Sequence, residues 1–211
     1  MALLAQAMAY HDLGYNLIPL AAGGKTPVGG WRFWQKRPQS AAWVERTFTA
    51  HSGNVGVLGG VTSTPGGRLY PYYLDFDDKG AYGELAPECP ATRRYETFRG
   101  GHVWLFAHAP VRTHAYKRHG FEVRGVGAYV MGPPSVHPSG LRYKFTDELV
   151  PVAVADEPRR RSLYPVPAPH LVPHPELLRP IRLGLPRLAP RLSDATVVED
   201  GELQGSKRAL G

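Results

Sequence analysis

Apolar residues recur at helical spacing in two segments near the N-terminus. In residues 2–12 they lie three to four positions apart, which predicts a first helix that ends at Gly14. Ser40 is a suitable N-cap for a second helix over the apolar and aromatic residues that follow it. Between the two helices, the mostly apolar run over 15–20 is typical of a β-strand.

After the second helix the pattern changes to that of strands joined by turns. Short runs rich in aromatic and β-branched residues are separated by glycine or proline. They predict strands over 54–58, 69–76, 93–98, 102–107, 121–124, 128–131 and 142–145. Within 102–107 both sets of alternating positions are apolar, as in a strand buried on both faces. The whole pattern predicts an α+β fold, with a mixed or antiparallel sheet on which a few helices pack.

The composition changes near Pro151. Between residues 158 and 190 there are nine prolines, interspersed with arginines, and so many prolines exclude a sheet interior or a long helix. Apolar residues in the same stretch favour partial docking over a free linker. We therefore divide the chain into a domain over 1–150, a Pro/Arg-rich extended arm or linker over 151–192 and a polar, flexible tail over 193–211.

Charge and cysteine content narrow the class of protein. The 211-residue chain has a formal net charge of +7 and a pI near 9.6, which favours a polyanionic partner. The single cysteine, Cys89, excludes a disulfide framework and a multi-cysteine zinc site, so we expect no zinc. No apolar run approaches the ~18 residues of a membrane span, and the first residues lack the basic start of a signal peptide. We expect a cytoplasmic protein that does not bind membranes.

A pair of acids at the end of a predicted strand has the clearest chemistry. Asp75 and Asp77 are two residues apart, so on a strand they project from the same face. Because neighbouring carboxylates repel each other unless a cation lies between them, the pair is a candidate site for Mg²⁺ or Mn²⁺, which prefer oxygen ligands. The alternative is an ordinary strand end that runs into a turn over 77–80.

A third acid, Glu122, lies within the apolar strand predicted over 121–124. As a further ligand it would complete a two-metal site, in which ions about 3.5–4 Å apart stabilise both oxygens of a phosphoryl displacement. The alternative is a surface carboxylate that pairs with Arg124 or a lysine.

Candidate phosphate-binding residues precede the strand predicted over 102–107. His102 follows Arg99, Gly100 and Gly101; the glycines would let the backbone approach a ligand closely, and Arg99 adds positive charge. The run is not a P-loop, because no Gly-Lys-Ser/Thr follows. A lone histidine at the start of a strand is otherwise structural.

Two loops contain further candidates. The proline-rich loop over 133–140 would present Ser135 and His137 to a nucleotide or template, unless it is a plain hairpin connection. Lys25, in a glycine-rich turn, would contact phosphate; the alternative is a solvated turn lysine.

The order of these motifs along the chain carries more information than any one of them. In sequence they are Gly14–Pro19, Lys25–Pro27 with Trp31, Asn54–Val57, Leu74–Asp77, Pro90–Thr92, Thr97, Gly100–His102, Val123–Gly125, Gly127–Val130, Pro133–Gly140 and Tyr143. In this order they resemble the primase-polymerase domain of the archaeo-eukaryotic primase superfamily, over roughly residues 5–150. Such domains occur in replication proteins of plasmids, phages and integrated elements, and beside some CRISPR systems.

The resemblance implies a fold and a role for each motif. It implies an RRM-like catalytic sheet beside an N-terminal α/β module, with the active cleft between them. Its acid-x-acid motif falls on Asp75 and Asp77, its loop ending in histidine on Gly100–His102, and its third acid on Glu122. The three acids would hold two Mg²⁺ or Mn²⁺ ions for nucleotidyl transfer, while His102 with Arg124 or Arg99 would bind phosphates.

Two positions depart from the family pattern. The third acid is usually aspartate, and Glu122 is one methylene longer, so the geometry and preference for the metal would shift. The loop before His102 is one residue shorter than the common form, which leaves the role of Arg99 open.

The implied partners are a single-stranded DNA template and primer and nucleoside triphosphates, with a helicase or another replication protein as a further candidate. We expect a monomer encoded by a prokaryote, phage, plasmid or other mobile genetic element. Two other hypotheses use the same residues: a metal-dependent nuclease or phosphoesterase, and a non-catalytic replication module that binds single-stranded DNA.

Overall fold

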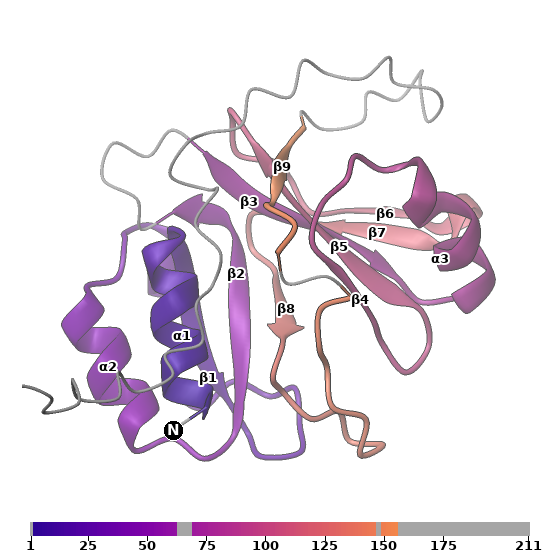
Figure 1. The fold of residues 1–211 in the computed structure, drawn as a ribbon. Helices are drawn as coiled ribbons and strands as arrows, with labels where there is room; N and C mark the ends of the chain where they lie inside the picture. The colour runs from indigo at the N-terminus through magenta and orange to yellow at the C-terminus, as the bar shows by residue number, and fades with distance from the viewer. Residues whose placement is uncertain (1, 63–68, 147–148, 156–211) are drawn as a thin grey trace, which may run out of the picture.

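Two β-sheets with helices on their outer faces make up the computed structural model of this chain (Figure 1). It describes residues 2–62, 69–146 and 149–155. The predicted arm beyond residue 155 and the tail over 193–211 lie outside the described residues. Within the described ranges, no helix is long and apolar enough to cross a membrane.

The N-terminal module is a three-stranded antiparallel sheet covered by two helices. The sheet has the order β1-β2-β8. Its elements are α1 (Ala2–Asp12), β1 (Tyr15–Leu20), the 3₁₀ helix η1 (Arg32–Gln35), α2 (Ala41–Thr49), β2 (Asn54–Thr62) and β8 (Tyr129–Gly132). Gly14 follows α1 with a φ of 89°, a conformation that favours glycine. Ser40 caps α2, because its side chain accepts a hydrogen bond from the Trp43 amide at 3.3 Å.

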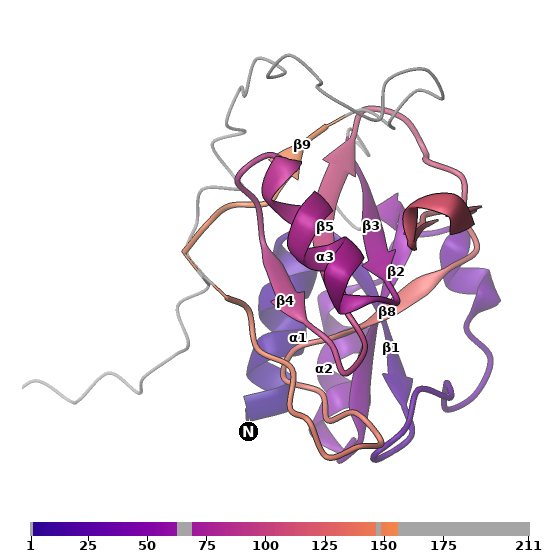
Figure 2. The same ribbon diagram turned by 90° about the vertical axis from the view of Figure 1, so that its right-hand side faces the viewer.

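The second sheet carries the predicted site. Five of its six strands follow the order β4-β5-β3-β7-β6, and the sixth, the short strand β9, pairs with β5 in parallel (Figure 2). The strands are β3 (Tyr70–Phe76), β4 (Arg94–Glu96), β5 (Gly101–Ala107), β6 (His114–Tyr116), β7 (Phe121–Arg124) and β9 (Ala153–Val154). The helices beside them are α3 (Lys79–Leu85) and the 3₁₀ helices η2 (Ala86–Glu88) and η3 (Lys117–His119). β3 lies at the centre, antiparallel to β5 and β7.

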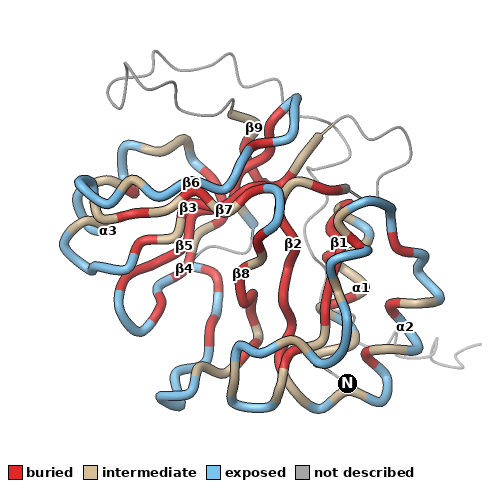
Figure 3. Tube along the Cα trace, turned by 180° about the vertical axis from the view of Figure 1, so that it is seen from behind, coloured by how far each residue is buried: buried red, intermediate tan, exposed pale blue. Residues whose placement is uncertain are grey.

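Alternation along the strands divides the interior into two cores. Trp104 and Phe106 of β5 pack with the N-terminal module in the first core, while Val103 and Leu105 join the second core beneath α3. Every residue of β5 is buried, which confirms the predicted strand with two buried faces (Figure 3). The same alternation in β3 sends Tyr73 to the first core, and therefore orients the acids that follow it toward the same side.

The structure confirms the predicted α+β fold and corrects parts of it. The strand predicted over 142–145 is wrong, because only Arg142 makes an isolated bridge there. Tyr143 and Phe145 are nevertheless buried in the first core, so their alternation reflects burial without a strand ladder. α3 and β6 were not predicted. Ala153–Val154, within the stretch assigned to the arm, is a strand of the six-stranded sheet.

Candidate active site

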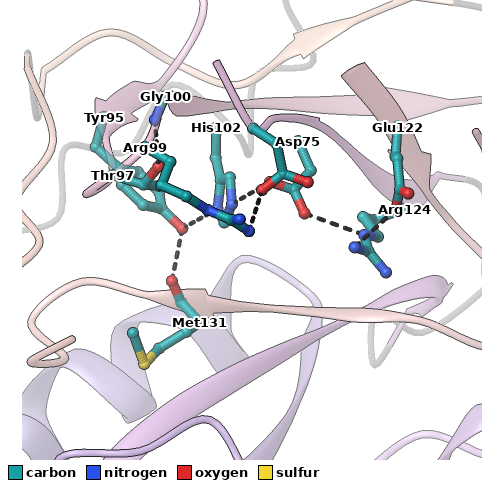
Figure 4. A network of polar contacts seen from close by, with 10 residues as sticks. Asp75, Tyr95, Thr97, Arg99, Gly100, His102, Glu122, Arg124 and Met131 are labelled. Carbon is teal, nitrogen blue, oxygen red and sulfur yellow. Dashed lines mark hydrogen bonds and ion pairs between the residues drawn. The ribbon is translucent and has the colours of Figure 1, made fainter. Parts of the chain in front are cut away.

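The C-terminal end of β3, the central strand of this sheet, places three predicted site residues side by side. In the register of the sheet, Asp75 lies opposite His102 of β5 on one side and Glu122 of β7 on the other. Directly opposed residues of antiparallel strands project from the same face. All three side chains therefore face the N-terminal module, on the side of the first core (Figure 4).

Asp75 is held by two basic side chains. His102 Nε2 lies 2.8 Å from one carboxylate oxygen of Asp75, and Arg124 Nε donates to the other at 3.1 Å. Burial alone raises the pKa of the Asp75 carboxyl, but the charges and hydrogen bonds of His102 and Arg124 outweigh it and lower that pKa to about 2. Asp75 is therefore an anion at any physiological pH.

Tyr95 of β4 fixes the far side of the His102 ring. Its hydroxyl donates to the Met131 carbonyl at 2.7 Å and lies 2.7 Å from His102 Nδ1. The His102 ring is therefore held between the Tyr95 hydroxyl on one side and the Asp75 carboxylate on the other.

The other acids are paired with arginines. Arg124 Nη2 lies 2.7 Å from a carboxylate oxygen of Glu122, so this guanidinium bridges Glu122 and Asp75. Asp77, more exposed, pairs with Arg99 at 2.8 Å. Across the described part of the chain, no three acid, histidine or cysteine side chains converge closely enough to hold a metal ion. The predicted ligands Asp75, Asp77 and Glu122 lie on one face, but here arginines compensate their charge.

The two glycines before His102 are explained by packing. A Cβ atom on Gly100 would lie 2.1 Å from the Phe76 carbonyl oxygen, and one on Gly101 would lie 2.3 Å from the Tyr82 ring of α3. The glycines therefore let the hairpin between β4 and β5 approach β3 and α3 closely. Neither lines the pocket described next.

A pocket of about 360 Å³ opens between the two sheets in front of Asp75. Of the predicted residues, it is lined by Lys25, Asp75, Asp77, Arg99, His102, Arg124 and His137. The other lining residues are Thr97, Phe98, Thr113, Gly127, Ala128, Tyr129, Val130, Met131 and Tyr143. Glu122 is not among them, although it contacts Arg124, which is.

The loop residues predicted from the sequence have different positions. Ser135 is buried outside the pocket, where its hydroxyl accepts from the Val55 amide of β2 at 2.9 Å. His137 lines the pocket and stacks on Phe98 with ring centroids 5.4 Å apart. Burial, and then the positive charges of Lys25 and Arg99, lower the pKa of His137. These two cations thus make the outer part of the pocket positive.

Sequence reasoning missed the aromatic residues that support the site. Tyr95, Tyr143 and Phe98 contact His102 or His137 directly or through one another. Tyr95 and Tyr143 are buried. The direction of the Tyr95 side chain could have been predicted. On the predicted strand over 93–98 it lies on the same face as Thr97 and on the opposite face from Arg94. Tyr143 is the last of the motif positions that carry the family resemblance, but no role was assigned to it, and for Phe98 no signal in the sequence indicated a functional position.

Comparison with known proteins agrees with this geometry. The sequence model of the family Prim-Pol, described as bifunctional DNA primase/polymerase, N-terminal, matches residues 7–166. The match covers more than half of the chain and includes the acid-x-acid strand, the hairpin with His102, and Glu122. No curated protein matches the sequence significantly.

Proposed function

We propose, because this chain belongs to the Prim-Pol family of bifunctional DNA primase/polymerases, that it synthesises and extends primers on single-stranded DNA by template-directed nucleotidyl transfer. The observation that carries the proposal is the ionised Asp75 near the C-terminal end of β3, which lines the pocket together with its partners His102 and Arg124. Anionic oxygens beside basic side chains are what a reaction between a hydroxyl and a nucleoside triphosphate requires.

Members of this family generally depend on a divalent metal ion. The donor set suits Mg²⁺ or Mn²⁺, because Asp75 and Glu122 on one face of the sheet, with Asp77 beside the same pocket as Asp75, offer hard oxygen ligands and Asp75 stays ionised. Asp75, Asp77 and Glu122 would hold two such ions. When bound, the ions would lower the pKa of the attacking 3′-hydroxyl and neutralise the pyrophosphate leaving group.

Arg124 is placed so that nucleotide binding would release the carboxylates of Asp75 and Glu122 for metal binding. Its guanidinium now contacts both Asp75 and Glu122. A triphosphate is a stronger partner for a guanidinium than a carboxylate, because it carries more charge and accepts bidentate hydrogen bonds. In our proposal the arriving triphosphate takes over Arg124 and so frees carboxylate oxygens of Asp75 and Glu122 for metal.

The remaining basic residues would bind the phosphates. His102 is fixed by Tyr95 and Asp75, so its ring is held at a constant position beside the pocket. Arg99 and Lys25 line the outer pocket, and their side chains are long enough to follow a polyphosphate. His137, stacked on Phe98, adds a flat surface for a base or sugar.

The test is synthesis from unprimed and primed single-stranded DNA with labelled nucleotides and Mg²⁺ or Mn²⁺. Wild-type protein should make short products and extend primers, whereas Asp75→Asn and Asp77→Asn should reduce both activities to background. Asp12→Asn, at the exposed end of α1, is the matched control and should keep full activity. Full activity in Asp75→Asn or Asp77→Asn would refute the assignment of these acids.

The same assay separates the other two hypotheses. A nuclease or phosphoesterase would degrade the DNA without added nucleotides. A non-catalytic binding module would yield no product and would bind DNA equally well with and without Mn²⁺. Either result would refute the proposed activity.

A further inference from the structure

The surface around η1 combines exposed positive charge with an exposed aromatic ring. Its members, which we call the η1 surface, are Arg32, Phe33, Lys36 and Arg37. All four are exposed, and Phe33 is 43% exposed although it is a large apolar residue. Its ring is thus accessible to a ligand.

No negative charge in the surrounding sequence offsets these cations. Residues 13–44 contain Lys25, Arg32, Lys36 and Arg37 and no aspartate or glutamate. Within the part of the chain that the structure describes, none of these four side chains is in an ion pair. The η1 surface is therefore suited to a polyanion.

The surface is held rigidly. The Asn16 side chain donates to the carbonyls of Trp34 and Arg37 at 2.8 Å each, so both ends of the turn are fixed to β1. Trp34 is buried beneath the turn. The Arg37 guanidinium lies over the rings of Phe33 and Trp34, 5.1 Å from each centroid. A ligand would thus find the groups already in position, with little ordering cost.

The η1 surface is also joined to the wall of the pocket. Gln35 accepts a hydrogen bond from the Gly127 amide at 3.1 Å, and Trp31 packs edge-on against Tyr129 with centroids 5.2 Å apart. Gly127 and Tyr129 both line the pocket, as does Lys25, whose carbonyl accepts from the Tyr129 hydroxyl at 2.9 Å. The η1 surface therefore adjoins the wall of the pocket that Asp75 also lines.

We propose that the η1 surface binds the single-stranded DNA template on its way to the pocket. Arg32, Lys36 and Arg37 contact successive phosphates, and Phe33 stacks against a base. This inference rests on the proposed function, because it takes the polyanion to be template DNA. Binding of this kind tolerates any sequence, since phosphates and the faces of bases are common to all of them.

The test measures binding alone, with fluorescent single-stranded oligothymidylate and no metal or nucleotide. Lys36→Ala with Arg37→Ala should weaken binding about tenfold at moderate salt and reduce the slope of log affinity against log salt by about 1.4, since each phosphate contact on a single strand contributes about 0.7. Phe33→Ala should weaken binding about fivefold or more and leave that slope unchanged.

The matched control removes two neighbouring cations from another 3₁₀ helix. Lys117 and Arg118 are exposed in η3, which lies at the turn between β6 and β7 beside α3. Lys117→Ala with Arg118→Ala gives the same change in net charge and should alter affinity less than twofold. Unchanged circular dichroism would show that the variants are folded.

The inference is overturned if the η1 variants bind DNA as the wild-type protein does, or if the η3 variant loses as much affinity as they do. Its failure is distinct from that of the proposed function. Wild-type protein that makes no product but loses binding in the η1 variants would retain the inference and refute the polymerase activity. If the wild-type protein makes product but the η1 variants bind DNA with unchanged affinity, the inference is refuted and the polymerase activity is retained.

Discussion

The two faces of the six-stranded sheet are built from the same three strands and have opposite chemistry. Across β5, β3 and β7, the residues in register are His102, Asp75 and Glu122 on one face and, one position along, Val103, Leu74 and Val123 on the other. The first set is polar, and its members His102 and Asp75 line the pocket, whereas the second set is buried beneath α3. The apolar face thus fixes the register on which the polar face depends.

That dependence follows from the two-residue period of a strand. A slip of one residue between β3 and β5 would turn Asp75 into the second core and Leu74 into the cleft. Burying a carboxylate without partners costs several kcal/mol, so the slipped pairing is strongly disfavoured. Leu74, Val103 and Val123 thus position the site without contacting a substrate.

The first test of this dependence is to weaken the apolar face. Leu74→Ala should lower the free energy of unfolding by about 3 kcal/mol, because it leaves a cavity between β3 and α3. Urea unfolding followed by circular dichroism measures this. Leu141→Ala, at an exposed leucine, should cost less than about 0.5 kcal/mol. A loss below about 1 kcal/mol for Leu74→Ala would mean that the apolar face does not hold the register.

The second test protonates the polar face. The pKa of Asp75 is about 2 in the folded protein and 3.8 without its partners, so the unfolded chain binds a proton more readily between these values. The stabilisation, about 2 kcal/mol, is present above about pH 4 and is lost as the pH falls toward 2. Urea unfolding of the wild-type protein between pH 5 and about pH 2 measures it.

The Asp75→Asn variant is the reference for that series. It has no carboxyl to protonate at this position, so its stability should fall less steeply over the same pH range than that of the wild-type protein. Parallel curves for the two proteins would show that Asp75 is not held ionised by His102 and Arg124.

The third and smallest effect concerns the contact between the two sheets at the site. Tyr95→Phe removes the hydroxyl that joins His102 to the Met131 carbonyl and should lower the free energy of unfolding by about 1 kcal/mol. Because His102 then loses its fixed position, kcat should fall severalfold while the KM for template stays unchanged.

Primer extension with varied template concentration measures the effects of Tyr95→Phe. Tyr70→Phe, at the opposite end of β3 from Asp75, is the matched control and should leave both parameters unchanged. Equal kcat values for Tyr95→Phe and wild-type protein would exclude a positioning role for Tyr95.

The sequence predicted the strands of the site well because their alternation is strong. One of these strands contains Asp75, one follows His102 and one contains Glu122. All three are apolar on the face opposite these residues. α3 was missed because its helix is short and contains Gly80 and Gly83, so Asp78 reads as a turn residue. In the structure Asp78 caps α3, and its side chain accepts from the Ala81 amide at 2.8 Å.

The contacts within the site could be predicted only in part. Acids two residues apart on a strand share a face by geometry, and a pairing of Glu122 with Arg124 was among the alternatives. That Arg124 also reaches Asp75 depends on the pairing of β3 with β7, which is a long-range contact. Ser135 was predicted to contact a nucleotide or template. Its hydroxyl instead forms hydrogen bonds with the backbone of β2, because the loop after β8 folds back over that strand.

The glycine at position 101 limits how this sequence can change over evolutionary time. It lies where the hairpin passes beneath the ring of Tyr82, and even a methyl group there would collide with that ring. An alanine at 101 is therefore accessible only after Tyr82 has become smaller, and a smaller residue at 82 on its own leaves a void. The two positions should accordingly be exchanged together in relatives, so that the backbone beside His102 stays in place while the residues around it diverge.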